Sequence, residues 1–433
     1  MVSFERFTLS NGLKVLVHED PTTPMAVVNI LYDVGARDEH PDQTGFAHLF
    51  EHLMFGGSIN IPSYDEPLQR VGGENNAFTS NDITNYYITL PSVNLETAFW
   101  LESDRMLSLA FSEKSLEVQR NVVCEEFKQR YLNQPYGDVW LKLRPMAYKK
   151  HPYRWATIGK ALDHIENASI DDVKAFFSRH YNPSNAIMVV AGDVKLEEVK
   201  KLSEKWFGNI PPTEKLSRRL PAEEAQTEAR KETVHANVPL NALYKAFHMP
   251  ARTEPGYYAA ELISDILSRG NSGRLFRNLL KDQKLFSDIH AYLTGSLDNG
   301  LFVVEGKPLP DISMGEAEAA IWKELDRLKN ELVTEQELTK VKNKNAWTKK
   351  AEDEVKAGRL KDFEELLLQA KKQILFFSGN LSFINFNDGK IDIVLASDDY
   401  VYVWTFNTSY TEKTSDWPMY MANPQHTSCY DCE

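Results

Sequence analysis

The sequence predicts an α+β protein that carries two similar units in tandem. Strand-like apolar runs alternate with helical patterns through about the first 210 residues, and the same order of elements starts again near Val234. Between them lies a charged segment almost free of large apolar side chains, which is typical of a linker. We expect a first domain at 1–210, a linker at 211–233, a second domain at 234–350 and a divergent tail at 351–433.

Length and charge narrow the possible functions. The chain has 433 residues, enough for two or three domains, and a net charge of −13. This acidic balance opposes non-specific binding to nucleic acid or to anionic membranes. No apolar run reaches the roughly 18 residues of a membrane span, and the first residues lack the pattern of a secretory signal. With three cysteines no disulfide scaffold is expected, and the compartment predicted is the cytoplasm.

Apolar patterns predict the elements of the first unit in chain order. Alternating residues indicate strands, and helical periodicity indicates helices. Asn11-Gly12 predicts a type I′ hairpin turn. The strands are expected at 13–19, 26–35, 85–92 and 185–194, and the helices at 94–109, 112–131, 170–180 and 195–207.

The second unit resembles the first only in the order of its elements. A strand at 242–250 is followed by a helix at 255–268 and a glycine-bearing break. A further helix and strands come next, and then one long helix from about 313 to 350. We expect mixed, mostly antiparallel sheets covered by helices in both units.

Two histidines four residues apart, His48 and His52, lie in the stretch TGFAHLFEHLMFGG with Glu51 between them. On a helix this spacing places both imidazoles on one face, where they can bind one metal ion. A catalytic zinc site takes three protein ligands and leaves one position open. Glu51 can lie beside that position as a general base, in the H-x-x-E-H pattern that inverts the zincin motif. The alternative is a coincidence of two histidines on one helix.

The third ligand is expected from the helical stretch at 117–130, which offers Glu117, Glu125 and Glu126. Glu126 shares the helix face of Val122 and Val123, which should point into the core. Glu125 is rotated toward solvent. Burial of a carboxylate is costly unless a cation pairs with it, and a zinc ion would be that cation. Glu126 is therefore the predicted ligand.

In isolation, Glu126 would be a solvated helix charge, and only the histidine pair makes it a ligand candidate. Gln119 and Arg130 flank the same helix face. Both are therefore candidates to orient the Glu126 carboxylate without binding the metal themselves.

Several segments of the first unit match one family closely, among them LSNGLKVLV, VGARDE, GFAHLFEHLMFGGS, GGENNAFTSNDITNYYITLP and EVQRNVVCEEFKQR. Through them the chain resembles the pitrilysin-like inverzincin peptidases, in particular the small two-domain bacterial members and the catalytic subunit of the mitochondrial processing peptidase. The resemblance implies one zinc ion per chain, bound by His48, His52 and Glu126, with Glu51 as general base. It implies a zinc-dependent endopeptidase that hydrolyses oligopeptides or unfolded segments.

The same family binds its substrate as an added strand at a sheet edge, next to the motif that stands here as ENNAFTS. The resemblance implies that Asn76, Ala77 and Phe78 offer backbone hydrogen bonds to an extended peptide. The alternative is an ordinary core strand, in which Phe78 would pack equally well.

The second unit resembles the second homologous domain of the family through ELISDILSRGNSGRLFRNLLKDQKL, and it departs from it in two ways. Active single-chain members carry an Arg and a Tyr where this chain has Leu280 and Ser287. This implies a homo- or hetero-dimer with a partner subunit that carries the pair. The alternative is a non-catalytic subunit that binds peptides or assists assembly.

The second departure is the tail, which replaces the end of the second domain and makes that domain atypical or truncated. The tail resembles the last blade of an FG-GAP-type β-propeller, whose loop can bind calcium through oxygen ligands. A fused or misjoined fragment that binds nothing is the favoured interpretation and calcium binding is the alternative, because a single blade cannot bury its faces. Relatives of this tail are usually exported, so a periplasmic or exported protein is the alternative to a cytoplasmic one. The oxygen ligands would come from Asn385, Asn387, Asp388 and Asp392.

Overall fold

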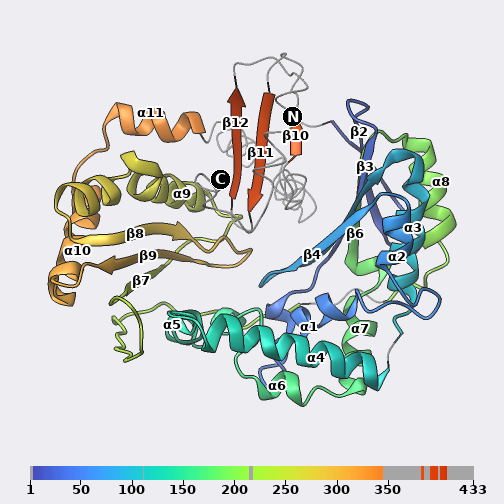
Figure 1. Ribbon diagram of the computed structural model, residues 1–433, viewed down its shortest axis with the longest axis horizontal. Helices are drawn as coiled ribbons and strands as arrows, with labels where there is room; N and C mark the ends of the chain where they lie inside the picture. The colour runs from blue at the N-terminus through green and yellow to red at the C-terminus, as the bar shows by residue number, and fades with distance from the viewer. Residues whose placement is uncertain are drawn as a thin grey trace, which may run out of the picture. The chain divides into compact units, whose positions relative to one another are not determined.

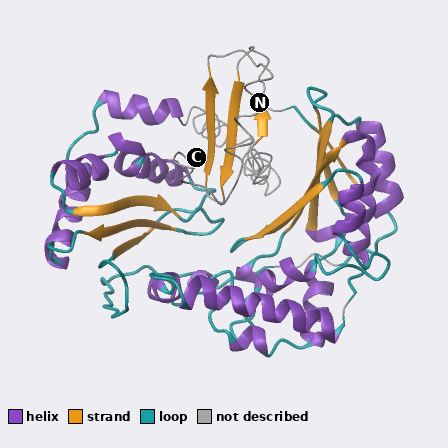
Figure 2. Cartoon of the chain, in the orientation of Figure 1, coloured by secondary structure: helices purple, strands orange, loops and turns teal. Residues whose placement is uncertain are grey.

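The computed structural model describes residues 3–110, 112–213, 218–344, 382–384, 391–397 and 400–406. The chain divides into two compact units, Met1–Glu337 and Leu338–Glu433. The N-terminal compact unit, Met1–Glu337, contains helices and two separate sheets, which confirms the α+β class (Figure 2).

The first sheet has six strands in the order β1-β2-β6-β3-β5-β4 (Figure 1). All neighbours are antiparallel except β2 and β6, which run parallel. Strand β4 has one neighbour, β5, so it forms an edge of the sheet. The strands are β1 (Glu5–Thr8), β2 (Lys14–Glu19), β3 (Met25–Tyr32), β4 (Glu74–Thr79), β5 (Thr84–Pro91) and β6 (Ala186–Gly192).

The main core lies between this sheet and the helices that pack on one of its faces. Alternate residues of β3, such as Val28, Ile30 and Tyr32, are fully buried there together with Phe50 and Phe99 from two of the helices. No helix within the described residues combines the length and the apolar character needed to cross a bilayer. The helices of this part are α1 (Phe46–Leu53), α2 (Asp65–Arg70), α3 (Leu95–Leu107), α4 (Glu113–Phe127), α5 (Val139–Ala147), α6 (Asp163–Glu166), α7 (Ile170–His180) and α8 (Leu196–Phe207).

The turn between β1 and β2 differs from the predicted type I′. Gly12 has a φ of 91°, whereas Asn11 is not among the residues with positive φ, and a type I′ turn needs both. Gly12 N donates to Leu9 O and Leu9 N donates to Leu13 O, both at 2.9 Å, which is the pattern of a three-residue turn that ends in a glycine bulge. The Asn11 amide instead donates to Phe207 O and Ile210 O at 2.7 and 3.0 Å, so tertiary contacts decide its conformation.

The second sheet has the order β7-β9-β8 with antiparallel neighbours. The predicted long helix is wrong, because α10 ends at Asn330 and a new helix, α11, begins at Glu335. Thr334 Oγ1 accepts from Glu337 N, and Thr334 N donates to Glu337 Oε2, so the TEQE sequence is a capping box that starts α11. The elements are β7 (Leu243–His248), α9 (Pro255–Ser268), the π-helix η7 (Leu275–Asp282), β8 (Phe286–Leu293), β9 (Leu301–Pro308), α10 (Met314–Asn330) and α11 (Glu335–Lys344).

The C-terminal compact unit, Leu338–Glu433, contains an antiparallel three-stranded sheet. This sheet lies in the tail, where strands were expected. Its strands are β10 (Ser382–Ile384), β11 (Ile391–Ser397) and β12 (Tyr400–Phe406). The candidate calcium ligands Asn385, Asn387 and Asp388 lie outside the described residues, and Asp392 lies in β11.

Candidate metal centre

Helix α1 carries the H-x-x-E-H residues. Its apolar residues Phe46, Leu49 and Phe50 are buried against the core, so His48, Glu51 and His52 lie on the remaining side of the helix. The helix begins after Gly45, whose φ of 91° is available to glycine at little cost. The Glu39 carboxylate accepts from Gly45 N at 2.9 Å and from Ala47 N at 2.8 Å. Glu39 thereby satisfies two of the backbone donors at the start of α1.

His48, His52 and Glu126 meet at one point. Glu126 Oε2 lies 3.6 Å from His48 Nε2 and 3.3 Å from His52 Nε2, and the candidate ligand atoms all lie within 4.8 Å of one another. Ligand atoms about 2.0 to 2.2 Å from a tetrahedral zinc ion lie about 3.4 Å apart. Two imidazole nitrogens and one carboxylate oxygen at these separations fit a zinc ion with an open position.

The electrostatics of these residues also suit a cation. Burial lowers the pKa of His48 to about 4, although the nearby Glu126 opposes this shift. The imidazole is therefore neutral near pH 7, which is the form that binds metals. Burial alone would raise the pKa of Glu126, but the hydrogen bond from His52 and the charge of Arg130 hold it below its ordinary value. Glu126 is therefore ionised and ready to bind a metal.

Helix α4 presents Glu126 at the border of its buried face. Val123 is buried, as expected, but Val122 is 45% exposed, so the prediction that both valines face the core is wrong. The carboxylate is still shielded, since its side chain is 18% exposed against 61% for Glu125. Glu125 turns away and pairs with Lys128 Nζ at 2.7 Å. The border position keeps Glu126 accessible to a metal and partly out of water.

The two residues predicted to orient Glu126 behave differently. Arg130 Nη1 lies 3.1 Å from Glu126 Oε1, the oxygen that does not face the histidines. Arg130 belongs to a five-residue π-helix, Lys128–Leu132, that continues α4. Gln119 is partly buried on α4, and among the described residues its amide makes no hydrogen bond. The contact to Glu126 thus comes from Arg130.

Glu51 lies beside the metal ligands and is held by a residue of β4. Thr79 Oγ1 donates to Glu51 Oε2 at 2.6 Å. Burial raises the pKa of the Glu51 carboxyl, while the Thr79 hydrogen bond and the charge of His52 act in the opposite direction. A raised pKa brings a carboxylate closer to the range in which it is an effective proton acceptor at neutral pH. Thr79 is not among the residues predicted from the sequence, although its alternation with Ala77 along the strand puts both on the α1 side.

Asn76, Ala77 and Phe78 all lie in the edge strand β4, but their backbones face different ways. Ser80 N donates to Ile83 O at 2.8 Å across the β4–β5 turn, so in an antiparallel pair Phe78 and Asn76 also direct their backbone groups toward β5. Ala77 N instead donates to the Asn76 side chain at 2.8 Å. Of the three residues, only Ala77 therefore has its N–H at the edge, where no described strand pairs with it.

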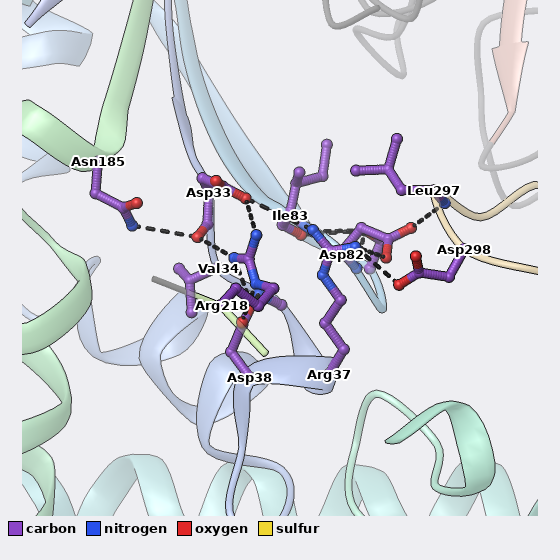
Figure 3. A network of polar contacts seen from close by, with 12 residues as sticks. Asp33, Val34, Arg37, Asp38, Asp82, Ile83, Asn185, Arg218, Leu297 and Asp298 are labelled. Atoms are coloured by element: carbon purple, nitrogen blue, oxygen red, sulfur yellow. Dashed lines mark hydrogen bonds and ion pairs between the residues drawn. The ribbon is translucent and has the colours of Figure 1, made fainter. Parts of the chain in front are cut away.

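A network of charged side chains joins the segment before α1 to the β4–β5 turn and the β8–β9 loop (Figure 3). Arg37 lies 3.0 Å from Asp82 in the β4–β5 turn and 3.4 Å from Asp298 in the β8–β9 loop. Asp82 Oδ2 also accepts from Leu297 N at 2.9 Å. Arg218, from the predicted linker, contacts Asp33 at 3.0 Å and also pairs with Asp38. Apolar periodicity and secondary-structure propensity do not predict such contacts, because the partners are far apart in the sequence.

Leu280 and Ser287, where the resemblance implies an Arg and a Tyr in active single-chain members, lie in the second sheet region. Leu280 is in the π-helix η7, and Ser287 is in β8, where its hydroxyl donates to Lys307 O at 3.0 Å. Leu280 has no donor and Ser287 uses its own within the sheet. Neither side chain offers the donor that those members supply.

Two family models and several known proteins match this chain. The family model described as Insulinase (Peptidase family M16) matches residues 14–159, and the model described as Peptidase M16 inactive domain matches residues 167–345. The zinc protease PqqE of Helicobacter pylori is 33% identical over 344 residues, which cover 78% of this chain and 77% of that protein. The uncharacterized zinc protease YmxG of Bacillus subtilis is 26% identical over 339 residues, covering 77% of this chain and 80% of that protein.

Solved structures show the same fold. The crystal structure of a protease from Helicobacter pylori has a TM-score of 0.76 and 32% identity, covering 87% of this chain and 92% of that chain. The crystal structure of a peptidase M16 inactive domain from Pseudomonas fluorescens has a TM-score of 0.73 at 20% identity, covering 79% of this chain and 83% of that chain. The second likeness concerns the fold alone.

Proposed function

Because the chain belongs to the insulinase family of peptidases (peptidase family M16), the pitrilysin-like family that its motifs indicated, we propose that it is a zinc-dependent endopeptidase of oligopeptides or unfolded segments. The observation that carries this proposal is the convergence of His48, His52 and Glu126, whose candidate ligand atoms lie within 4.8 Å of one another. Glu51, next to His52 on α1, supplies the base that hydrolysis needs.

In this proposal His48, His52 and Glu126 would hold one zinc ion, which would supply Lewis-acid polarisation of the scissile carbonyl and of the attacking water. Glu51 accepts a proton from that water and delivers it to the leaving amine. The charge of Arg130, 3.1 Å from Glu126 Oε1, keeps the ligand carboxylate ionised and oriented. In this proposal His48 and His52 of α1 and Glu126 of α4 bind the metal, and Glu51 of α1 transfers the proton.

The substrate would bind as a strand added to the edge of the first sheet at β4. Ala77 directs its N–H to that edge, and a peptide there would replace the Asn76 side chain as its acceptor. The side chains of Asn76 and Phe78 lie on the opposite face of the strand from Ala77 and would contact neighbouring residues of the peptide. Addition of a strand needs an extended peptide, which favours unfolded segments over folded proteins.

We further propose that a different partner subunit completes the site in a hetero-dimer, because a second copy of this chain would carry the same Leu280 and Ser287. Transition states of peptide hydrolysis carry negative charge on oxygen, and loss of one donor to this oxygen typically costs about 10² to 10³ in rate. Leu280 cannot donate, and Ser287 donates to Lys307 O instead. A partner with an Arg and a Tyr at these positions would supply the missing donors.

Zinc content and peptide cleavage, measured on the same samples, test the proposal. The variants His48→Ala and Glu126→Gln should lose zinc, because each removes one of three ligands. Glu125→Gln is the matched control on α4, since Glu125 is exposed and pairs with Lys128, and it should keep about one zinc per chain. Folded wild-type protein without zinc would overturn the assignment of the ligands.

The missing Arg and Tyr favour one second candidate, a non-catalytic peptide-binding or assembly subunit. Such a subunit would bind an unfolded peptide without cleaving it, both alone and with a partner that carries the pair. Cleavage of a quenched fluorescent peptide by the zinc-loaded chain, alone or with such a partner, would exclude this candidate. Binding without cleavage in both cases would establish it.

A further inference from the structure

Thr79, the last residue of β4, contacts the carboxylate of Glu51 through its hydroxyl. We propose that Thr79 is a positioning residue for the general base and links it to the strand that binds the substrate. This inference rests on the proposed function, because it concerns the same reaction. Its central observation is the hydrogen bond of 2.6 Å from Thr79 Oγ1 to Glu51 Oε2.

The direction of this contact follows from the pleat of β4. Side chains alternate along a strand, so Ala77 and Thr79 point to the same face. Ala77 packs against the core that includes α1, and the Thr79 hydroxyl on the same face reaches Glu51 in that helix. The register that pairs Thr79 with Thr84 of β5 sets its position along the strand.

The backbone N–H and carbonyl of Thr79 point in a different direction from its side chain. Because Ser80 uses its N–H toward Ile83 O in β5, and backbone directions alternate in antiparallel pairs, Thr79 directs its N–H and carbonyl to the edge of the sheet, as Ala77 does. A substrate strand at this edge would therefore lie along the backbone of the same residue whose hydroxyl holds the base. Thr79 thus couples the position of the substrate strand to the position of the Glu51 carboxylate.

The bond also decides which oxygen of Glu51 is free. Thr79 occupies Oε2, so Oε1 remains to accept the proton of the attacking water. Without the hydroxyl the buried carboxylate loses a donor and can turn about its last bond, which misplaces the accepting oxygen. Small misplacements of reacting groups cost up to about 100-fold in rate. The effect should fall on kcat, since peptide binding at the backbone edge does not use the hydroxyl.

Replacement of the hydroxyl by a methyl group of similar size tests this role. We expect Thr79→Val to lower kcat about 10- to 100-fold, to leave KM within about twofold, and to keep the wild-type zinc content. Thr79→Ser restores the donor and should return kcat to within about threefold of wild type. The matched control is Thr89→Val, a half-buried threonine of β5 on the opposite face of the sheet, which should match wild type.

A Thr79→Val enzyme with wild-type kcat would overturn the proposal. It would also be overturned if Thr79→Ser were as impaired as Thr79→Val, because the methyl group rather than the hydroxyl would then matter. Wild-type protein that binds zinc and cleaves no peptide, with or without a partner, would overturn the proposed function, and this inference would fall with it.

Stability of the metal-free protein gives a readout that does not depend on activity. If the hydroxyl bonds to Glu51, the shifts in urea midpoint caused by Thr79→Val and Glu51→Ala should not add in the double variant. The double variant should unfold at a higher urea concentration than the sum of the two shifts predicts. Additive shifts would overturn the Thr79 contact while leaving the peptidase proposal intact.

Discussion

Arg37 Nη1 lies 3.0 Å from Asp82 Oδ1, and this buried ion pair joins two segments that lead into the metal centre. Arg37 belongs to the short helix Ala36–Asp38 that precedes α1, and Asp82 lies in the turn that follows β4. Backbone bonds strengthen the junction, since Ala36 N donates to Ser80 O and Arg37 N to Asn81 O. The helix that carries the histidines and the edge strand are therefore held together from one end.

Loss of the Arg37 charge should destabilise the protein strongly. Arg37→Met leaves the buried Asp82 carboxylate without its cation, and removal of one partner of a buried pair costs on the order of 3 to 5 kcal/mol. Asp298→Asn should cost less than about 1 kcal/mol, because Asp298 is 44% exposed. Urea unfolding followed by circular dichroism measures both. Equal losses in the two variants would contradict the central role of the Arg37–Asp82 pair.

Glu39 should control zinc affinity through the position of α1. Glu39→Gln can accept only one of the two backbone bonds from Gly45 and Ala47, because its amide nitrogen is a donor. We expect zinc binding to weaken about 10-fold. Glu19→Gln is the matched control, since Glu19 caps α8 through Leu196 N at 2.9 Å and does not contact α1. Competition with a chelating dye measures the affinities, and equal zinc affinity of Glu39→Gln and wild type would refute the prediction.

Glu51→Gln should separate metal binding from proton transfer. The amide cannot accept the proton of water, so kcat should fall about 10² to 10⁴-fold. Zinc content should stay at the wild-type level, because Glu51 is not among the three candidate ligands. Metal analysis beside the peptide assay tests both statements. Loss of zinc together with activity would make Glu51 a ligand instead of the base.

Acid should remove the contribution of Glu337 to stability. The two hydrogen bonds from Arg274 and those from Thr334 lower the pKa of Glu337 from its ordinary 4.5 to about 2, although burial opposes this. A folded-state pKa below the unfolded value stabilises the protein above about pH 4.5, and the gain is lost as the pH falls toward 2. Glu337→Gln should therefore cost about 2 kcal/mol at pH 7, after a discount for partial exposure, and about half of that or less at pH 3, where the folded-state carboxyl is still mostly ionised.

Urea titrations at both pH values measure this difference. Glu331→Gln is the control for an exposed pair, since Glu331 contacts Arg327 at the surface, and its effect should stay within about 0.5 kcal/mol at either pH. A stability gap between wild type and Glu337→Gln that is the same at pH 7 and pH 3 would show that the ion pair does not stabilise the fold.

Much of the candidate site could be predicted because it depends on local geometry. Four-residue spacing on a helix brings His48 and His52 to one face in any tertiary context. Glu126 was found by a burial argument, and the structure brings its carboxylate to the histidines even though Val122, used in that argument, is exposed. Thr79 could not be found this way, because its role depends on which helix covers β4.

The fold shows the same division. Apolar periodicity predicted strands β2, β3, β5 and β6 and helices α3, α4, α7 and α8, and the zinc motif was recognised from its spacing, since each depends on residues near one another in the chain. Only the tertiary structure decided the turn at Asn11, whose amide bonds to Phe207 O and Ile210 O, and the charge network around Arg37. These contacts join residues far apart in sequence, and their energies depend on burial and direction, which no local pattern of residues contains.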